Sequence, residues 1–392
     1  VYLRWFSGRR ARFLAFSAAW TLGEMFRSWV LTGFPWLLVG TSQIDAPLQG
    51  YFPLTGVYGV TLLVAISASA VVEGWRKRRL ALIAVLLIWS TGPLLDRIDW
   101  TTSAKTPVVV ALIQSNIPQE LKWRSSELQR IIDIHVDMSK DVWGSDLVVW
   151  PEAAIPTFRS RIEPLLDNLS ALASANGSTL ISGIPSQGSD KNGNQTTYNS
   201  VIALGNGEGH YFKRRLVPFG EYVPLEEWLR GLIAFFDLPM SDFVSGPESQ
   251  PLISSGDLKI AAAICYEIVY PDQVAADAQN SNILLTVSND TWFGTSIGPL
   301  QHLEMARVRA IENGRPVVRA TNNGVSALID DNGIIIARGK QFSREIIRGE
   351  LMPTNGWTPF GRWRSVPILI LCLMLLILTR ADQHRVYRSR PT

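Results

Sequence analysis

The chain has 392 residues, of which 47% are apolar and only 18% are charged. This composition is more apolar than that of an ordinary soluble domain, so membrane segments are the first feature to look for. The net charge of +3 is small and gives little support to a nucleic-acid-binding protein.

Four apolar segments predict membrane-spanning helices. They cover residues 13–31, 53–72, 80–96 and 363–380. A bilayer core of about 30 Å needs about 20 helical residues. The second segment meets this requirement and carries no charged residue, whereas the third is slightly short. The sequence therefore predicts transmembrane helices within residues 1–100 and one more near the C-terminus.

Lys and Arg gather in three clusters beside these segments. The clusters are Arg4, Arg9, Arg10 and Arg12; Arg76, Lys77, Arg78 and Arg79; and Arg380, Arg385, Arg388 and Arg390. Short cytoplasmic loops are enriched in Lys and Arg. If all four segments cross, residues 101–360 lie on the extracytoplasmic face and residues 381–392 form a cytoplasmic basic tail. No cleavable signal pattern is seen, and the chain is expected to be a fragment of a longer membrane protein.

The middle of the chain alternates short strands with helices. Strands are predicted at 108–116, 146–152, 179–184, 199–205, 209–216, 259–267, 282–290, 316–324 and 326–339, and helices at 125–142, 161–175, 272–279 and 299–312. This alternation favours one α/β domain. Residues 330–333 predict a hairpin turn within the last strand segment, and residues 187–195 have the character of a loop.

Cys265 stands in the stretch AAICYE, near the end of an apolar strand. The second cysteine, Cys372, falls in a predicted membrane segment, so Cys265 has no plausible disulfide partner. Most free cysteines are small buried hydrophobes, which makes packing one interpretation. Chemistry is the other, because open α/β sheets bind ligands beyond the carboxyl ends of their strands.

A catalytic thiol needs a base or a cation nearby, since only the thiolate attacks. The histidines offer no base at a strand end, and each is interpreted as structural or solvated; they are His135, His210, His302 and His384. None has metal-ligand spacing. Glu152 and Lys213 do follow apolar strands. Each can be an exposed loop charge, or both can meet Cys265 at a shared sheet edge.

Several longer stretches resemble a known family. WPEAAIP, YFKRRLVPFGEYVPLE, AAICYEIVYP, SNDTWFG and RATNNG together resemble the nitrilase superfamily. More narrowly, NIPQELKW, LVPFGEYVP, FFDLPMSDF, SIGPLQH and GFPW, with membrane segments on both sides, resemble the bacterial apolipoprotein N-acyltransferases. This resemblance extends from about Trp20 to the last membrane segment. It implies a nitrilase-like α-β-β-α sandwich inserted between transmembrane helices, with further membrane helices ahead of the matched region.

The resemblance also implies roles for individual residues. Glu152 is the general base, Lys213 the cation beside the oxyanion, and Cys265 the nucleophile that forms a thioester. The implied supporting residues are Glu221, Tyr266 and Glu267, and the implied substrate-binding or lid residues are Trp123, Phe219, Trp292 and Phe293. Plainer interpretations stay open: a loop carboxylate for Glu221, core packing for Tyr266 and a membrane-interface anchor for Trp123. The apolar stretch 228–240 is expected to rest on the bilayer surface or to form core under a loop.

The implied reaction transfers a fatty acyl chain from a membrane phospholipid to an apolipoprotein. The acceptor is the α-amine of the N-terminal diacylglyceryl-cysteine. The resemblance implies a multi-pass protein of the bacterial inner membrane with its catalytic domain on the periplasmic face. We expect it to be monomeric and to use neither a cofactor nor a metal. Two alternatives are a membrane-tethered amidase or nitrilase that uses water, and an inactive membrane scaffold or transporter, which would predict a damaged triad.

Overall fold

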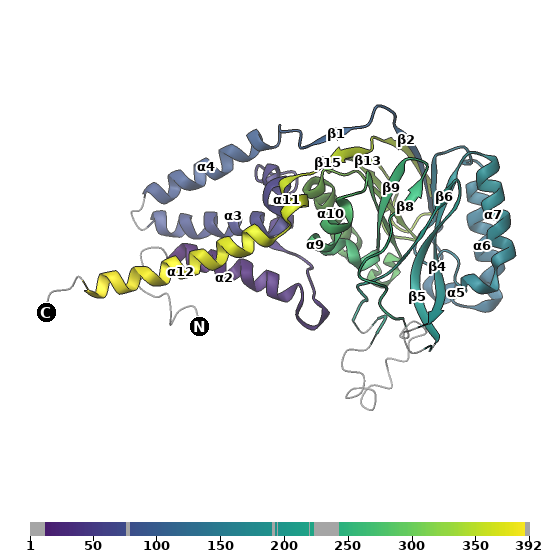
Figure 1. Cartoon of the computed structure of the whole chain (residues 1–392), viewed down its shortest axis with the longest axis horizontal. Coiled ribbons are helices and arrows are strands. Elements are labelled where there is room, and N and C mark those ends of the chain that lie inside the picture. Colours follow the sequence, from purple (N-terminus) through teal and green to yellow (C-terminus); the bar gives the residue numbers. More distant parts are fainter. Residues whose placement is uncertain are drawn as a thin grey trace. The chain divides into compact units, whose positions relative to one another are not determined.

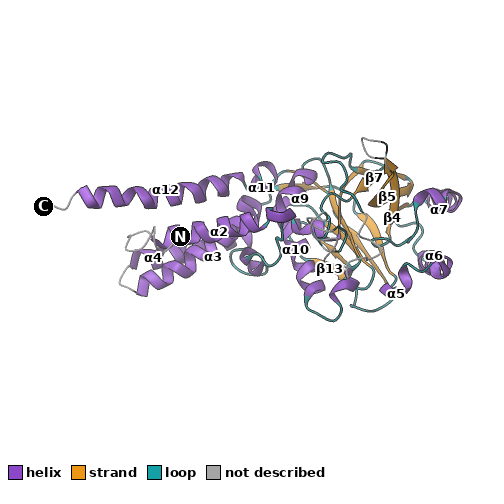
Figure 2. Ribbon diagram, turned by 90° about the horizontal axis from the view of Figure 1, so that it is seen from below, coloured by secondary structure: helices purple, strands orange, loops and turns teal. Residues whose placement is uncertain are grey.

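The computed structural model describes residues 12–75, 79–189, 193, 195–218, 220–222 and 243–388. The chain divides into two compact units, one made of residues 1–100 together with 357–392 and the other of residues 101–356. The described part of the first unit is helical, whereas the second combines strands and helices (Figures 1 and 2).

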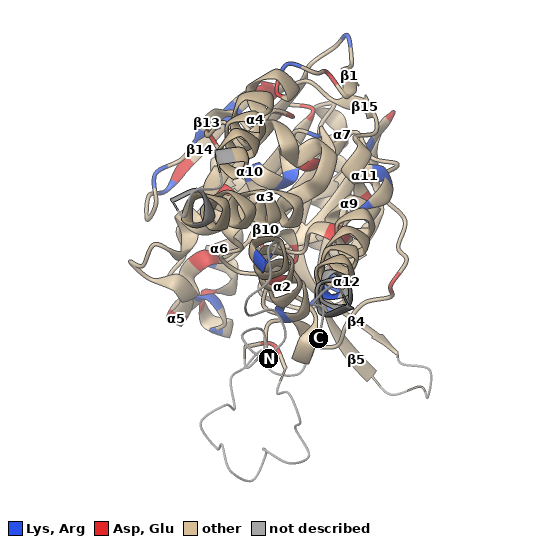
Figure 3. Ribbon diagram, turned by 90° about the vertical axis from the view of Figure 1, so that its left-hand side faces the viewer, with Lys and Arg blue, Asp and Glu red and all other residues tan. Residues whose placement is uncertain are grey.

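The first unit contains five described α-helices. They are α2 (Arg12–Arg27), α3 (Phe52–Trp75), α4 (Arg79–Leu95), α11 (Pro359–Trp363) and α12 (Val366–Arg388). Within the described residues, one helical stretch, Gln49–Val72, is long and apolar enough to cross a membrane, and Leu80–Leu95 and Val366–Arg380 are shorter apolar helices. The only charged residue of α3 is Glu73, so nearly all of this ribbon is tan in Figure 3, without the blue or red that marks charged residues. Membrane crossing by all four segments stays a prediction.

Two ends of the predicted spans are wrong. The first helix ends at Arg27, and Leu31 beyond it adopts a left-handed φ of 50°. The last long helix begins at Val366 because the chain turns at Arg364, which has a φ of 55°. Inside this unit, buried Glu24 accepts hydrogen bonds from the Val39 amide (3.0 Å) and the Thr61 hydroxyl (2.9 Å). The helix α2 is thereby tied to the segment that leads into α3.

The second unit is built on two large sheets. The six-stranded sheet has the order β14-β2-β3-β4-β5-β7, and the seven-stranded sheet has the order β13-β12-β11-β10-β9-β8-β6. The first comprises Val108–Gln114 (β2), Leu147–Val149 (β3), Thr179–Ser189 (β4), Gln195–Gly205 (β5), His210–Phe212 (β7) and Glu345–Leu351 (β14). The second comprises Gly207–Glu208 (β6), Ile253–Ser255 (β8), Leu258–Ile264 (β9), Ile283–Ser288 (β10), Val317–Thr321 (β11), Ala327–Ile329 (β12) and Ile335–Arg338 (β13). A small third sheet pairs β1 (Thr101–Ser103) with β15 (Thr354–Gly356).

The two large sheets face each other across an apolar core, and helices cover their outer faces (Figure 1). Leu112, Val149 and Val201 of one sheet pack in the same cluster as Ile264 and Val287 of the other. The helices are α6 (Leu128–Ser139) and α7 (Glu163–Ala175) on the six-stranded side, and α9 (Pro271–Ala278) and α10 (Gly298–Asn313) on the seven-stranded side. The layers follow the α-β-β-α order that the family resemblance implies.

Parallel pairing sets the position of the site. The strands β2, β3 and β4 run parallel, as do β9, β10 and β11, and helices connect them. Such crossovers place the carboxyl ends of successive parallel strands at one edge of a sheet. Residues that directly follow these strands therefore gather at that edge.

Several details differ from the sequence prediction. The strand predicted to Glu267 ends at Ile264, because Cys265 has a left-handed φ of 51°. The strand predicted to Leu216 ends at Phe212. The expected loop at 187–195 is wrong at both ends, since β4 runs to Ser189 and β5 starts at Gln195. The strand β14 was not predicted. The predicted hairpin at 330–333 is confirmed by the antiparallel pair of β12 and β13.

Candidate active site

Three chemically capable side chains follow three different strands. Glu152 comes after β3 and Lys213 after β7, both in the six-stranded sheet, whereas Cys265 comes after β9 in the seven-stranded sheet. Glu152 is 5% exposed and Lys213 1% exposed. The two sheets therefore contribute from opposite sides to one buried cluster.

Each carboxylate oxygen of Glu152 has its own donor. Asn199 Nδ2 donates to Oε1 at 2.7 Å, and the main-chain N–H of Asn289 donates to Oε2 at 2.7 Å. Lys213 Nζ lies 3.7 Å from Oε1. The main-chain carbonyl of Glu152 accepts a hydrogen bond from Lys122 Nζ at 2.8 Å. Glu152 is therefore fixed at both its side chain and its backbone.

Lys213 is paired with a second carboxylate. Its Nζ donates to Glu221 Oε1 at 2.8 Å, and Asn199 Nδ2 reaches the same oxygen at 3.1 Å. The other oxygen of Glu221 accepts from the Val217 amide at 2.9 Å. Burial by itself would lower the pKa of Lys213, but Glu221 and Glu152 outweigh it and raise the pKa above its usual value. Lys213 therefore stays an ammonium ion, and its nearer carboxylate partner is Glu221.

Cys265 sits at a sharp change of chain direction. Burial raises the pKa of its thiol well above the usual range; the Glu152 carboxylate adds to this, whereas Lys213 lowers it. The side chain therefore rests as a neutral thiol, which cannot attack without a base. Both Glu152 and Lys213 act electrostatically on the thiol, so a carboxylate base and a cation are present beside the candidate nucleophile.

Glu267 links the backbones on the two sides of the site. Its Oε2 accepts from the Ile264 amide at 2.8 Å, and its Oε1 accepts from the amides of Arg214 (2.8 Å) and Arg215 (3.1 Å). The hydroxyl of Tyr211 donates to the same carboxylate at 2.9 Å. One buried carboxylate thus holds the residue before Cys265 and the residues after Lys213. Its neighbour, Tyr266, is buried with its ring edge-on to that of Tyr270.

The predicted substrate-facing aromatic residues lie on two short segments. Trp123 ends the short helix α5 (Gln119–Lys122), and its indole N–H is buried without a hydrogen-bond partner. Trp292 and Phe293 belong to the 3-10 turn Asp290–Phe293, which follows β10, and Trp292 is 54% exposed. Phe219 and the stretch 228–240 lie outside the described residues.

Several polar residues of the site were missed by the sequence analysis. Asn199 opens the apolar run SVIALG, and Lys122 precedes the conspicuous Trp123. Asn322 follows β11; its Nδ2 donates to Asn289 Oδ1 at 3.0 Å and its Oδ1 accepts from the Ile117 amide at 2.9 Å. Asn322 directly follows an apolar strand, which is a signal that could have pointed to it, whereas Asn199 lies inside β5 and Lys122 in the short helix α5.

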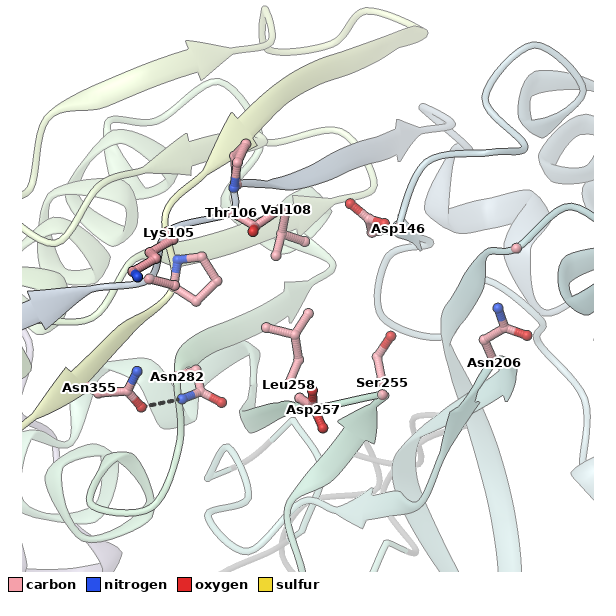
Figure 4. A pocket seen from close by; sticks show the side chains of 15 residues that line it. Lys105, Thr106, Val108, Asp146, Asn206, Ser255, Asp257, Leu258, Asn282 and Asn355 are labelled. Atoms are coloured by element: carbon pink, nitrogen blue, oxygen red, sulfur yellow. Dashed lines mark hydrogen bonds between the residues drawn. The ribbon is translucent and has the colours of Figure 1, made fainter.

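An open cavity of about 850 Å³ lies near the amino ends of β2 and β9, at the opposite end of these strands from Cys265 (Figure 4). Its lining includes Val108 and Leu258, the first residues of β2 and β9, and the polar residues Lys105, Asp146 and Asn282. None of its lining residues belongs to the cluster around Cys265. Among the described residues, no group of three or more His, Cys, Asp and Glu side chains is arranged to hold a metal ion.

Comparisons with known proteins match both parts of the chain. Residues 109–354 match the carbon-nitrogen hydrolase family, and residues 1–70 match the apolipoprotein N-acyltransferase N-terminal domain. An apolipoprotein N-acyltransferase of Pseudomonas syringae pv. tomato is 46% identical over 384 residues, which are 96% of this chain and 76% of that protein. One of Pseudomonas paraeruginosa is 47% identical over 370 residues, 93% of this chain and 72% of that protein. A crystal structure of a Saccharomyces cerevisiae member of branch 10 of the nitrilase superfamily has a TM-score of 0.47 and 21% identity, covering 69% of this chain and 97% of that one.

Proposed function

The chain belongs to the apolipoprotein N-acyltransferase family, and from this premise we propose that it acylates lipoproteins through a thioester on Cys265. The acyl donor is a membrane phospholipid. The acceptor is the N-terminal amine of a diacylglyceryl-modified apolipoprotein. The observation that carries the proposal is the buried cluster of Glu152, Lys213 and Glu221 beside the Cys265 thiol.

The first half-reaction moves the acyl chain onto the enzyme. Glu152 takes the thiol proton while Cys265 Sγ attacks the ester carbonyl of the phospholipid. The oxyanion that forms is stabilised by the Lys213 ammonium, which Glu221 keeps charged and oriented. The ester C–O bond then breaks, the lysophospholipid leaves with the proton returned by Glu152, and the acyl chain stays on sulfur. General base catalysis of this kind typically contributes about 10²- to 10⁴-fold.

The second half-reaction uses the same groups. The acceptor amine attacks the thioester carbonyl, and Glu152 takes a proton from the amine nitrogen. The C–S bond breaks, the thiolate is reprotonated by Glu152, and the amide is released. Two successive substrates at one nucleophile correspond to ping-pong chemistry. The neutral resting state of Cys265 suits this cycle, because the base removes the proton only when a carbonyl is in place.

Mass spectrometry tests the proposal directly. After incubation of the whole chain with phospholipid, we expect a mass increase equal to one fatty acyl group. Hydroxylamine removes it, and the Cys265→Ala protein never acquires it. A diacylglyceryl-cysteine peptide with a free amine then discharges the adduct, whereas the same peptide with an acetylated amine does not.

Two outcomes would contradict the proposal. A wild-type protein that never carries an acyl group under turnover conditions rules out the thioester. An adduct that disappears into water at the same rate with either peptide identifies a hydrolase, which is the amidase alternative. The Glu152→Gln protein separates base catalysis from folding, with Glu120→Gln, an exposed position on α5, as the matched control.

Membrane placement belongs to the same proposal. The four predicted spans carry the chain across the bilayer, and residues 101–360 face the extracytoplasmic side. The three Lys and Arg clusters and the apolar stretch Gln49–Val72 support this arrangement. Trp123, Trp292 and Phe293 are proposed to contact the lipid substrates, and Trp292 has the exposed surface that such a contact needs.

A further inference from the structure

A second buried polar cluster contacts Cys265 through its main-chain carbonyl. It consists of Ser288, Asp290, His302 and Arg319, none of them more than 1% exposed. They come from the end of β10, the turn after it, the helix α10 and the strand β11. None of them takes part in the reaction steps above. Buried polar groups at such density are costly unless they satisfy one another, so the hydrogen bonds of the cluster define its role.

The hydrogen bonds of His302 fix the state of its ring. Nε2 lies 3.1 Å from the main-chain oxygen of Cys265, which can only accept, so Nε2 carries a hydrogen. Nδ1 lies 3.1 Å from Arg319 Nη2, which can only donate, and 3.2 Å from Asp290 Oδ1, which can only accept. The contact with Cys265 needs a hydrogen on Nε2 whatever the charge of the ring, so in the neutral ring the single hydrogen lies on Nε2 and Nδ1 accepts from Arg319. Burial lowers the pKa of His302, and the charge of Arg319 lowers it further, in agreement with the neutral form.

Asp290 holds the other members of the cluster. Its Oδ2 accepts from Arg319 Nη2 at 2.7 Å, and its Oδ1 accepts from the Ser288 hydroxyl at 2.5 Å. Burial opposes ionisation, but Arg319 and His302 outweigh it and lower the pKa of Asp290 to about 2. Arg319 is thereby fixed by an ion pair while its Nη2 also points at His302.

The cluster reaches Cys265 at two points. His302 binds the Cys265 carbonyl, and the Ser288 hydroxyl is a hydrogen-bond partner of the Cys265 thiol. The second contact follows from strand register, because Ile264 is paired with Val287 and the next residue of each strand lies alongside. Cys265 adopts a φ of 51°, a left-handed conformation that is unfavourable for a residue with a side chain. Such a conformation persists where its surroundings over-determine it.

We propose that His302 is a positioning residue for the acyl transfer: its Nε2–H holds the Cys265 carbonyl so that Sγ faces Glu152 and Lys213. Arg319, which Asp290 holds in place, donates to Nδ1 and so favours the ring with its hydrogen on Nε2. The inference rests on the proposed function, since it assumes that Cys265 is the nucleophile. It goes beyond that function by assigning a role to a histidine that touches no substrate.

Two amide substitutions distinguish the roles of the two ring nitrogens of His302. In His302→Gln the amide nitrogen reaches the place of Nε2 and still donates to the Cys265 carbonyl. In His302→Asn the shorter side chain replaces Nδ1 only. Both are compared by the rate of single-turnover acylation with phospholipid vesicles, by the KM for phospholipid and by thermal unfolding. Cys372→Ser serves as the background, so that Cys265 is the one thiol.

We expect His302→Asn to lower the acylation rate about 10- to 100-fold with little change in KM, because small misplacements of a reacting atom have costs of that size. His302→Gln restores most of the rate. Equal rates for Asn, Gln and the background protein would overturn the inference. So would equal loss in both variants with unchanged unfolding temperatures, because the donor at Nε2 would then have no role.

Alkylation of Cys265 by iodoacetamide across a pH series gives a readout that needs no acyl donor. The inference predicts that the profile of His302→Gln follows that of the background protein and that the profile of His302→Asn is displaced. A wild-type protein that alkylates but forms no thioester contradicts the proposed function alone. Coincident profiles for all three proteins contradict the inference alone.

Nitrogen-15 NMR of the histidine rings tests the inference even if both variants fail to fold. In a protein with His210→Gln and His384→Gln, two labelled rings remain. We expect His302 to be neutral at neutral pH, with its hydrogen on Nε2. His135 provides the contrast, since its Nδ1 lies 2.8 Å from the Ile131 oxygen and must carry the hydrogen. A charged His302, or one with its hydrogen on Nδ1, overturns the inference.

Discussion

Lys122 and Glu267 each bring a buried charge onto main-chain groups beside the reacting residues. Lys122 binds the carbonyl of Glu152, and Glu267 binds the amides of Arg214 and Arg215. Hydrogen bonds to charged groups are shorter and stronger than those between neutral groups. A buried charge without a partner is costly, so these pairings hold the backbone tightly. The proposed catalytic residues are therefore held in place by neighbours whose charged groups bind the main chain.

Substitution of Lys122 by Met is expected to slow acylation about 10- to 100-fold, because the Glu152 carbonyl loses its donor and the base shifts. Stability at high pH changes as well. Burial lowers the pKa of Lys122 to about 8 from 10.5, although Glu152 and Cys265 oppose this. Between these values the unfolded chain binds more protons, so the wild-type protein gains roughly 3 kcal/mol as the pH rises. The Lys122→Met protein lacks this gain.

The measurements are the single-turnover rate and the unfolding free energy at a series of pH values. The matched control is Lys140→Met, whose side chain is 67% exposed. The idea fails if Lys122→Met acylates at the wild-type rate, or if its stability curve runs parallel to that of the wild type from about pH 8 to 10.5.

Among single residues, the sequence predicts the proposed catalytic side chains better than the residues that hold them in place. Glu152 and Lys213 stand out because charged residues rarely follow apolar strands without a reason. Asn199 and Lys122 do not stand out, because their partners lie far away along the chain, and single amide or ammonium contacts leave no periodic pattern. The role of His302 was missed for the same reason, since its interpretation as a structural residue is correct for the ring but says nothing of the carbonyl it holds.

Among the elements, β4 shows most directly how a strand shapes the site. Gly183 lies in this strand, where a β-carbon would come within 2.5 Å of the Ala153 amide nitrogen and 2.7 Å of Glu152 Cα. The segment that carries Glu152 can therefore lie against β4 only because residue 183 has no side chain. The edge strand β14 was not predicted because its sequence, EIIRGEL, mixes polar and apolar residues. It nevertheless pairs with β2 along its whole length.

The substitution Gly183→Ala is expected to push the segment 151–153 away from β4 and to lower the acylation rate about 100-fold. The control is Gly188→Ala in the same strand, where the added carbon meets only side-chain atoms, nearest the ring of Tyr198. Acylation rates and thermal unfolding of both proteins are compared. Wild-type activity in the Gly183→Ala protein would show that acylation does not depend on the close packing of segment 151–153 against β4.

The helix α6 makes the second unit sensitive to acid. Burial lowers the pKa of His135 to about 4, and its Nε2 has no hydrogen-bond partner. The unfolded histidine titrates near 6.5, so the unfolded chain binds the proton more readily than the folded one does. Stability is complete above about pH 6.5 and falls by roughly 3 kcal/mol as the pH drops to 4.

An amide at position 135 tests this sensitivity. The His135→Asn side chain still donates to the Ile131 carbonyl but cannot be protonated. We expect its unfolding free energy to decline less than that of the wild type between pH 6.5 and 4, by circular dichroism in denaturant. The exposed His210→Asn variant should follow the wild type. Identical acid sensitivity in the two variants would assign it to other groups.

On the scale of the whole molecule, the sequence best predicts the continuous apolar strands and the longer helices of the second unit. The apolar strands β2, β9 and β10 and the helices α7 and α10 fall within a few residues of their predicted bounds. The turn at Cys265 is not predictable in this way, because it arises from contacts of Glu267 and His302 with the main chain. Membrane crossing rests on hydropathy and on the Lys and Arg distribution, which are properties of the sequence alone.

Cysteine labelling tests the orientation. In a protein without its native cysteines, Asp257→Cys, at an exposed turn of the second unit, should react with a membrane-impermeant maleimide added to spheroplasts. Gln383→Cys, in the predicted cytoplasmic tail, should react only after the membrane is opened. The reverse pattern would place the catalytic unit in the cytoplasm and refute the proposed topology.

The division of the site between two sheets has a consequence for how the protein matures. Glu152 and Lys213 belong to one sheet and Cys265 to the other, so neither sheet alone carries a complete triad. On the proposed mechanism, the base and the cation emerge first during synthesis, and the thiol gains its activating partners only when the second sheet has docked onto the first. An unfinished chain would then hold an inert cysteine, and the appearance of thioester chemistry would mark the moment at which this unit has finished folding.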